Sequence, residues 1–158
     1  MMVSTRGRYA LRAVIDLAEH SGDGAYVPLA DIASRQGISE KYLESIASAL
    51  SKAGVVVGVR GKGGGYRLAS EPERCRVLDV LRATEGSMAP VACLACEPNT
   101  CERATDCPTL PVWEGLGRVV DSYLAGISIA SLMEADAACD EEGRAPGNCA
   151  DAGEDVDA

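Results

Sequence analysis

Four cysteines lie within fifteen consecutive positions of the chain, at Cys93, Cys96, Cys101 and Cys107, with the spacing C-x2-C-x4-C-x5-C. The segment around them is punctuated by prolines and contains few residues of the kind that form a hydrophobic core. Thiolates are soft ligands that select zinc or an iron–sulfur cluster, and four on one short loop can converge on a single metal centre. The spacing therefore predicts a metal-binding loop, and by itself it leaves zinc and iron equally open.

The chemistry of these cysteines depends on the compartment in which the chain folds. No apolar run approaches the roughly 18–20 residues needed to span a bilayer, and the N-terminus carries charges inside its apolar pattern, unlike a signal peptide. We therefore expect a cytoplasmic protein with no membrane partner. Thiols stay reduced in the cytosol, so clustered cysteines there are typical of metal ligands or redox sensors.

The net charge of −9 is distributed unevenly along the chain. Residues 1–70 carry nine Lys and Arg against six Asp and Glu, a net of +3, whereas residues 71–133 carry −4 and residues 134–158 carry −8. A mildly basic N-terminal part is compatible with binding to nucleic acid. The last segment is acidic and aperiodic, so we expect it to be disordered. We expect its two cysteines, Cys139 and Cys149, to be bystanders.

Apolar periodicity and turn signals predict three helices in the first third of the chain. Apolar positions recur at helical spacing over residues 5–20. Pro28 opens a second, short helix that Gly37 closes. A third helix, N-capped by Ser39, is expected from Glu40 to about Ala53. Two helices joined by a tight turn that contains glycine form the helix-turn-helix pattern.

A glycine-rich turn, Gly61-Lys62-Gly63-Gly64-Gly65, follows between two runs of strand-forming residues. This pattern predicts a β-hairpin with a basic tip, which is the wing of a winged helix. A short helix that ends at Gly86 and a long helix from Pro108 onward are expected next. We therefore predict a mainly α fold with a small β-hairpin wing. It divides into a winged helix-turn-helix DNA-binding domain (1–86), a cysteine-rich loop (87–107), a dimerisation helix region (108–133) and a tail (134–158).

The long helix carries a stripe of large side chains at helical spacing: Val112, Trp113, Leu116, Val119, Val120, Tyr123 and Leu124. The chain contains no Phe and a single Trp, so its core is thin and leaves this stripe uncovered within one subunit. We expect the stripe to pack against a second copy of the chain. A two-fold homodimer would recognise an inverted repeat in double-stranded DNA.

Several segments in sequence order resemble one family of bacterial transcription factors. They are GRYALRAVIDLA, VPLADIASRQGISEKYLESI, VRGKGGGYRLA, and C-x5-C with a Trp six residues on. Over residues 3 to about 133 the chain is similar to the IscR/NsrR-type winged-helix regulators, which are dimeric and in many cases carry an iron–sulfur cluster. The resemblance implies a DNA-binding regulator, expected to be a repressor. It would sense cluster status, oxygen species or nitric oxide.

The resemblance also implies which residues carry the function. The segment GISEKYLE is similar to the family's major-groove helix, and VRGKGGGY to its wing, where Arg60 takes the minor-groove position. Cys101 and Cys107 match two cluster ligands, and Cys93 or Cys96 matches the third. Three successive glycines also let the backbone of the wing approach phosphates closely. The candidate DNA contacts are Ser39, Lys41, Tyr42, Glu44, Arg60, Lys62, Gly63 and Gly64.

The fourth cluster ligand departs from the family pattern. Leu110 stands where one branch has a ligand histidine, and Arg8 stands where another has a ligand carboxylate. The extra loop cysteine is the candidate replacement, with Cys93, Cys101 and Cys107 as the other ligands and Cys96 as the fourth. We expect a [2Fe–2S] cluster ahead of a [4Fe–4S] cluster. The alternatives are zinc, or a thiol switch without metal.

Other functional classes find less support in the residues. An iron–sulfur electron carrier would use the same cysteines but would have no use for a helix-turn-helix and a wing. No nucleophile–base pair is evident, and His20, the single histidine, is expected to sit near a helix end without a function. We therefore expect neither an enzyme nor a small-molecule substrate. Cys75 is predicted to be a small buried residue.

Overall fold

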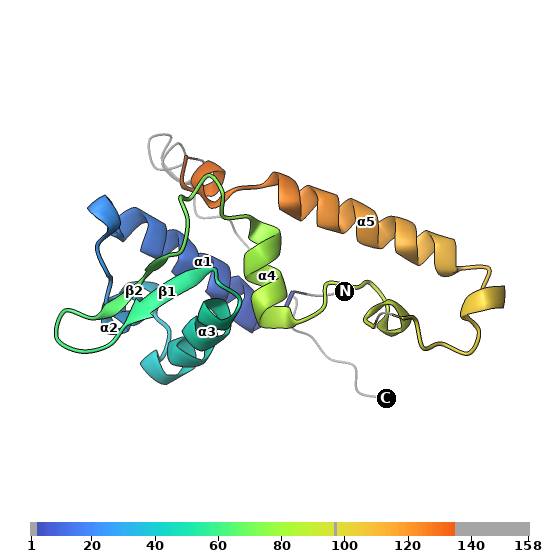
Figure 1. The fold of residues 1–158 in the computed structure, drawn as a ribbon, viewed down its shortest axis with the longest axis horizontal. Helices are drawn as coiled ribbons and strands as arrows, with labels where there is room; N and C mark the ends of the chain where they lie inside the picture. The colour runs from blue at the N-terminus through green and yellow to red at the C-terminus, as the bar shows by residue number, and fades with distance from the viewer. Residues whose placement is uncertain (1–2, 97, 135–158) are drawn as a thin grey trace, which may run out of the picture.

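The computed structural model describes residues 3–96 and 98–134 of the chain. The predicted acidic tail, with Cys139 and Cys149, lies outside the described residues except for Glu134. Figure 1 shows a helical body that carries a small hairpin, with one long helix reaching away from it. The cysteine-rich loop and the hairpin tip lie at opposite ends of the molecule.

The first helix, α1 (Thr5–His20), forms the centre of the body and packs along α4 (Val77–Glu85). The side chain of Ser4 caps α1 by accepting a hydrogen bond of 3.2 Å from the Gly7 amide. Its buried face comprises Gly7, Ala10, Ala13, Val14, Asp16 and Leu17. This face follows the helical spacing that the sequence predicts. Asp16 is its one charged residue.

The predicted helix-turn-helix is confirmed as α2 (Leu29–Gln36) and α3 (Glu40–Lys52). Gly37 ends α2 with φ of 64°, a left-handed conformation that costs glycine little. The side chain of Ser39 accepts a hydrogen bond of 3.3 Å from the Tyr42 amide and so caps α3. Local capping chemistry therefore sets the turn between the two helices.

The wing is a two-stranded antiparallel hairpin of β1 (Val56–Val59) and β2 (Gly65–Leu68), with Val56 opposite Leu68 and Val59 opposite Gly65. Val27, which follows the short turn η1 (Gly22–Gly24), forms an isolated antiparallel bridge with Tyr66. This bridge fixes the hairpin to the segment that leads into α2. The wing and the helix-turn-helix are thus one connected unit.

The long helix, α5 (Leu110–Gly126), begins two residues later than the sequence predicts. Pro108 and Thr109 form a turn after η3 (Ala104–Asp106), and the Leu110 amide donates to the Cys107 carbonyl at 3.3 Å. Pro111 lies in the first turn of α5, where its missing amide proton leaves no helical hydrogen bond unmade. The other short turn of the loop is η2 (Ala92–Leu94).

After α5 the chain returns to the body. The Ile127 carbonyl accepts from the Val77 amide at 3.1 Å, and the Ile129 amide donates to the Cys75 carbonyl at 2.9 Å. Ile129 is fully buried among core side chains of α1 and α4. Residues 129–134 are helical, and Ser128 caps them through a hydrogen bond of 3.1 Å from the Ser131 amide.

The mainly helical fold with one hairpin matches the predicted fold class. None of the helices in the described part of the chain is long and apolar enough to cross a membrane.

Candidate nucleic-acid interface and cysteine loop

The first turns of α3 present the side chains predicted to contact DNA. Lys41 and Glu44 are exposed. Ser39 is exposed too, but its hydroxyl already serves as the cap of α3. Tyr42 is half-buried, because its ring packs edge-on against Tyr9 of α1 with 6.1 Å between ring centroids. Two of the four candidates are therefore free to reach bases, and the other two also hold the helix in place.

The tip of the wing exposes Arg60, Lys62 and Gly63. Gly64 has a different role from its neighbours. Its amide donates to the Gly61 carbonyl at 2.9 Å, and a Cβ at this position would overlap the Val59 carbonyl oxygen. Gly64 is thus required by the turn itself, while the two cations project from it.

A groove of about 800 Å³ separates α3 from the wing. Glu44 lines it from α3, and Arg60 lines it from the wing. Further residues that were not predicted from the sequence also line the groove, among them Glu40, Ser48, Lys52 and Tyr66. Ser48 and Lys52 follow Glu44 at steps of four residues, so the helical period was the signal that would have found them. The groove therefore has a carboxylate on the wall formed by α3 and a guanidinium on the wall formed by the wing.

Polar contacts fix the end of α2 to α1. Arg12 of α1 donates to the side-chain oxygen of Gln36 at 3.0 Å and to its carbonyl at 2.9 Å. The carboxylate of Asp16 is buried and accepts from Arg35 and from Gln36. Burial raises the pKa of Asp16, but these hydrogen bonds and the nearby charge of Arg35 lower it more, so the pKa falls below its ordinary value. Asp16 therefore stays ionised and holds the turn that leads into α3.

The four loop cysteines are free thiols at separate places on the loop. Cys93 lies in η2 and is half-buried, Cys96 and Cys101 are exposed, and Cys107 is half-buried at the end of η3. Within residues 3–96 and 98–134, no three His, Cys, Asp or Glu side chains lie close enough together to hold a metal ion. The described loop thus carries four thiol donors, but no three of them form a metal site.

Cys107 differs chemically from the buried thiol of Cys75. A hydrogen bond with the Thr109 side chain, aided by backbone hydrogen bonds at Thr109 and Leu110 and by the charge of Arg103, lowers the pKa of Cys107. This favours the thiolate, which is the form that ligates metals. Burial instead raises the pKa of Cys75 to about 11, and its side chain is 5% exposed, so its predicted place in the core is confirmed.

The donor set on the loop fits an iron–sulfur cluster in its chemistry, because all four candidates are thiols and none is consumed by a disulfide. Neither departure from the family pattern offers another ligand. Leu110 has no donor atom, and Arg8 is an exposed cation that donates to Thr5 at 3.1 Å. Within the loop, Cys96 and its neighbour Cys93 remain the thiol candidates for a fourth ligand.

The predicted apolar stripe of α5 is divided between two faces. Val112, Leu116, Val119 and Tyr123 are 61%, 44%, 66% and 69% exposed. Trp113, Val120 and Leu124 are half-buried, and Leu124 packs against the core of its own subunit. The sequence predicted six of them along one side of the helix with Trp113 beside them, but the helical wheel sets the centres of these two groups roughly 90° apart. Within the described residues, no element covers the exposed group.

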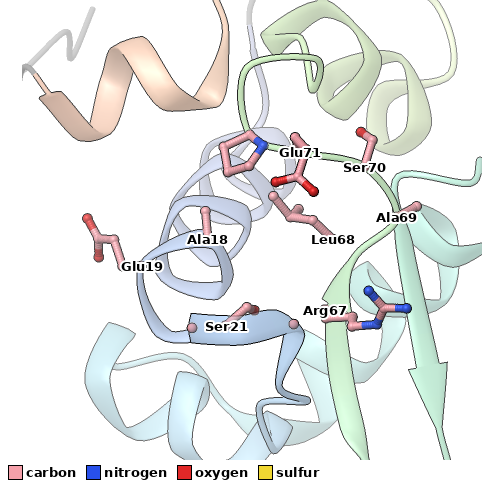
Figure 2. Close-up of a pocket in the computed structure, with 11 residues that line it drawn as sticks. Ala18, Glu19, Ser21, Arg67, Leu68, Ala69, Ser70 and Glu71 are labelled. Atoms are coloured by element: carbon pink, nitrogen blue, oxygen red, sulfur yellow. The ribbon is translucent and has the colours of Figure 1, made fainter.

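A separate cavity of about 520 Å³ lies between the end of α1, η1 and β2. In Figure 2, Glu71 points across the space between α1 and β2, whereas Glu19 points outward from α1 and Arg67 points to the far side of β2. The charged groups around this cavity do not converge on one point. It therefore lacks the arrangement by which a protein fixes a small polar ligand.

Comparison with known proteins gives one consistent result. The family model Rrf2, described as an iron-dependent transcriptional regulator, matches residues 3–135. The regulator IscR of Aliivibrio salmonicida (strain LFI1238) is 44% identical over 133 residues, which are 84% of this chain and 77% of that protein. IscR of Vibrio atlanticus (strain LGP32) is 42% identical over 134 residues, covering 85% and 76%.

Solved structures agree with the sequence matches. The structure of IscR from T. potens has a TM-score of 0.67 and 38% identity, and the match covers 93% of this chain and 94% of that one. The structure of CymR, the global cysteine regulator of B. subtilis, has a TM-score of 0.67 and 33% identity over 85% of this chain and 97% of that one.

Proposed function

The chain belongs to the Rrf2 family of DNA-binding transcriptional regulators, and on that premise we propose that an iron–sulfur cluster on its cysteine loop controls its affinity for DNA. It is a regulator and not an enzyme. The observation that carries the proposal is the separation of the two functional regions. The cysteine loop and the tip of the wing, which borders the groove, lie at opposite ends of the molecule (Figure 1).

The DNA-reading part of the proposal rests on the groove between α3 and the wing. Glu44 is exposed on α3 and would accept a hydrogen bond from a cytosine amino group in the major groove. Arg60 and Lys62 are exposed at the hairpin tip and would contact the DNA there, with Arg60 entering the minor groove. Lys41 would neutralise a phosphate beside α3. In this proposal the carboxylate supplies base selectivity, and the cations supply most of the affinity.

The sensing part rests on the loop between α4 and α5. Cys93, Cys96, Cys101 and Cys107 would hold the cluster, which when bound supplies a centre that reacts with oxygen species and nitric oxide. A [2Fe–2S] cluster is proposed ahead of a [4Fe–4S] cluster. No three of these thiols lie close enough together in the described structure to hold a metal ion, so binding a cluster would require the loop to change shape. That change would act on the two helices to which the loop is joined.

The assembly part rests on the exposed face of α5. Val112, Leu116, Val119 and Tyr123 form an apolar strip that would be covered by the same strip of a second copy, as two-fold symmetry requires. One α3 reads few base pairs, and a dimer doubles that number. The proposed operator is therefore an inverted repeat whose half-sites lie one helical turn, or a multiple of it, apart. Repression is the proposed outcome of binding.

Anaerobic purification of the full chain tests the proposal, with visible absorbance and assays of iron and acid-labile sulfide. Brown protein that binds a selected inverted repeat with an affinity dependent on cluster content is the expected result. Colourless protein that contains zinc and binds DNA would replace the sensor with a zinc-stabilised regulator. DNA binding that responds to oxidants without any metal would point to a thiol switch. Brown protein that does not bind DNA specifically would favour the electron-carrier hypothesis instead.

A further inference from the structure

The last residue of α4, Glu85, binds the residue that caps the first helix. The Oε1 atom of Glu85 accepts hydrogen bonds from the Ser4 amide at 3.0 Å and from the Ser4 hydroxyl at 2.6 Å. Ser4 is itself the N-cap of α1, and its hydroxyl oxygen accepts from the Gly7 amide at 3.2 Å. Glu85 therefore joins the end of α4 to the start of α1 over a separation of 81 residues.

Two features of α1 favour a carboxylate at this place. The first turn of α1 contains no acidic residue of its own, so Glu85 supplies the negative charge that the positive end of a helix dipole attracts. Gly7 is buried beside it, and a Cβ there would overlap Oε1 of Glu85. The absence of a side chain at Gly7 thus makes room for the carboxylate.

The start of α1 in turn holds the recognition helix. Nη2 of Arg6 donates to the Ser45 carbonyl of α3 at 3.0 Å. Ser45 is adjacent to Glu44, the side chain proposed to read a base. Nε of Arg6 is buried and has no hydrogen-bond partner among the described residues, so the guanidinium is confined between the helices by this one hydrogen bond.

On its other side, Glu85 adjoins the cysteine loop. Gly86 ends α4 with φ of 79°, and its amide donates to the Arg82 carbonyl at 3.1 Å. The chain leaves the body at this point and enters residues 87–107. A change in the direction of the loop is therefore applied first to the C-terminal turn of α4, where Glu85 lies.

We propose that Glu85 is a positioning residue that couples the cysteine loop to α3 through the start of α1. The inference rests on the proposed function, since it concerns how a change in the loop reaches DNA. The linkage runs from Glu85 to Ser4, within the first turn of α1 to Arg6, and from Arg6 to the backbone of α3. Loss of the Glu85 contact frees the start of α1, and Arg6 then no longer holds α3 at a fixed place.

The first arm of the test uses the cluster-free full chain and amide hydrogen exchange. The variants are Glu85→Ala and the conservative Glu85→Gln, with Glu73→Ala as the control, because Glu73 is an exposed glutamate outside this linkage. Glu85→Ala is expected to speed exchange about tenfold both in residues 4–8 and in α3, as loss of a charge-assisted hydrogen bond implies. Faster exchange at the start of α1 with α3 unchanged would overturn the linkage.

The second arm measures the operator Kd of cluster-loaded and cluster-free protein. Wild type is expected to show a ratio in the range of about 5–150-fold that is typical of coupled sites. Glu85→Ala should bring the ratio close to one with its visible absorbance unchanged, and Glu85→Gln should restore part of it. A wild-type ratio retained in Glu85→Ala would refute the coupling role and leave the proposed function intact. A wild-type ratio of one would remove both.

Discussion

Asp16 and Arg35 join α1 to α2 through paired hydrogen bonds between carboxylate and guanidinium. Nε of Arg35 lies 3.0 Å from Oδ2 and 3.2 Å from Oδ1 of Asp16, and Nη2 also contacts Oδ1. The Asp16 side chain is 2% exposed and the Arg35 side chain 34%. The pair is thus buried at its acidic end and reaches solvent at its basic end.

Replacing the buried carboxylate should destabilise the fold. Asp16→Asn removes the negative charge and leaves the donors of Arg35 and Gln36 poorly paired, at a cost of about 1.5–3 kcal/mol in the free energy of unfolding. Urea unfolding of the cluster-free chain measures this cost, with Glu73→Gln as the matched loss of an exposed charge. An equal unfolding midpoint for Asp16→Asn and wild type would show that the pair contributes nothing.

The same pair predicts how stability depends on pH. The pKa of Asp16 is lowered in the folded state, so its contribution is complete above the unfolded value of about 4 and is lost as pH falls through the folded value. The difference in unfolding free energy between wild type and Asp16→Asn should therefore be constant near neutral pH and shrink below about pH 4. A difference that grows on acidification would contradict the sign of the shift.

Cluster binding is predicted to need all four loop cysteines. Single Ser variants of Cys93, Cys101 and Cys107 should lose visible absorbance and iron, because each removes a thiolate ligand. Cys96→Ser should do the same if it supplies the fourth ligand. Cys75→Ser, which changes a buried thiol outside the loop, is the control and should keep its cluster. A full cluster in Cys96→Ser and also in Cys96→Ala, which has no side-chain donor atom, would mean that a group from outside this set completes the site.

The wing and α3 should contribute to DNA binding in different ways. Arg60→Ala is expected to weaken binding and to reduce the salt dependence by about one unit if the side chain neutralises a phosphate. If Arg60 enters the minor groove, the loss should be concentrated on sites rich in A·T. Fluorescence anisotropy over a salt series distinguishes the two.

Glu44→Ala provides the contrast on the same surface. It should cost little affinity, because a carboxylate gains nothing from nearby phosphates, but it should relax base preference at one position in each half-site. Competition with single-base operator variants gives the measurement. Unchanged preference in Glu44→Ala would exclude it as a reading residue.

The exposed face of α5 should control assembly. Leu116→Asp combined with Val119→Asp places two charges in the strip and is expected to give monomers that keep their helix content but bind the operator weakly. Ala125→Asp adds a charge to the same helix on the face opposite the strip and should remain dimeric. Sedimentation decides the question, and a monomeric wild type at micromolar concentration would remove this interface.

The sequence predicted the elements whose ends depend on local chemistry. Ser39 and Gly37 set the helix-turn-helix through a side-chain cap and a left-handed turn, both of which are visible as residue types. The Asp16–Arg35 pair was missed because its two residues meet only after α1 and α2 pack, and helical periodicity assigns position 16 no polar role. The orientation of α5 was missed for the same reason. It depends on where α4 lies, because Arg82 of α4 forms an ion pair with Asp121 of α5.

The arrangement of the thiols could not be predicted for a different reason. Spacing identifies Cys93, Cys96, Cys101 and Cys107 as donors, but it does not fix where a loop of low apolar content places them. Few contacts hold such a segment in one shape, and in metal-binding loops the missing energy commonly comes from the metal itself.

The return of the chain after α5 makes this helix a lever with one fixed end. Ile129 is buried in the core, and its amide donates to the Cys75 carbonyl. The opposite end of α5 is joined to the cysteine loop and lies about 25 Å away, the length of a helix of 17 residues. A movement of about 2 Å at the loop, ordinary for a helix shift, corresponds to a pivot of about 5° at Ile129. In two copies that pack along α5, this rotation would change the angle between the two wings.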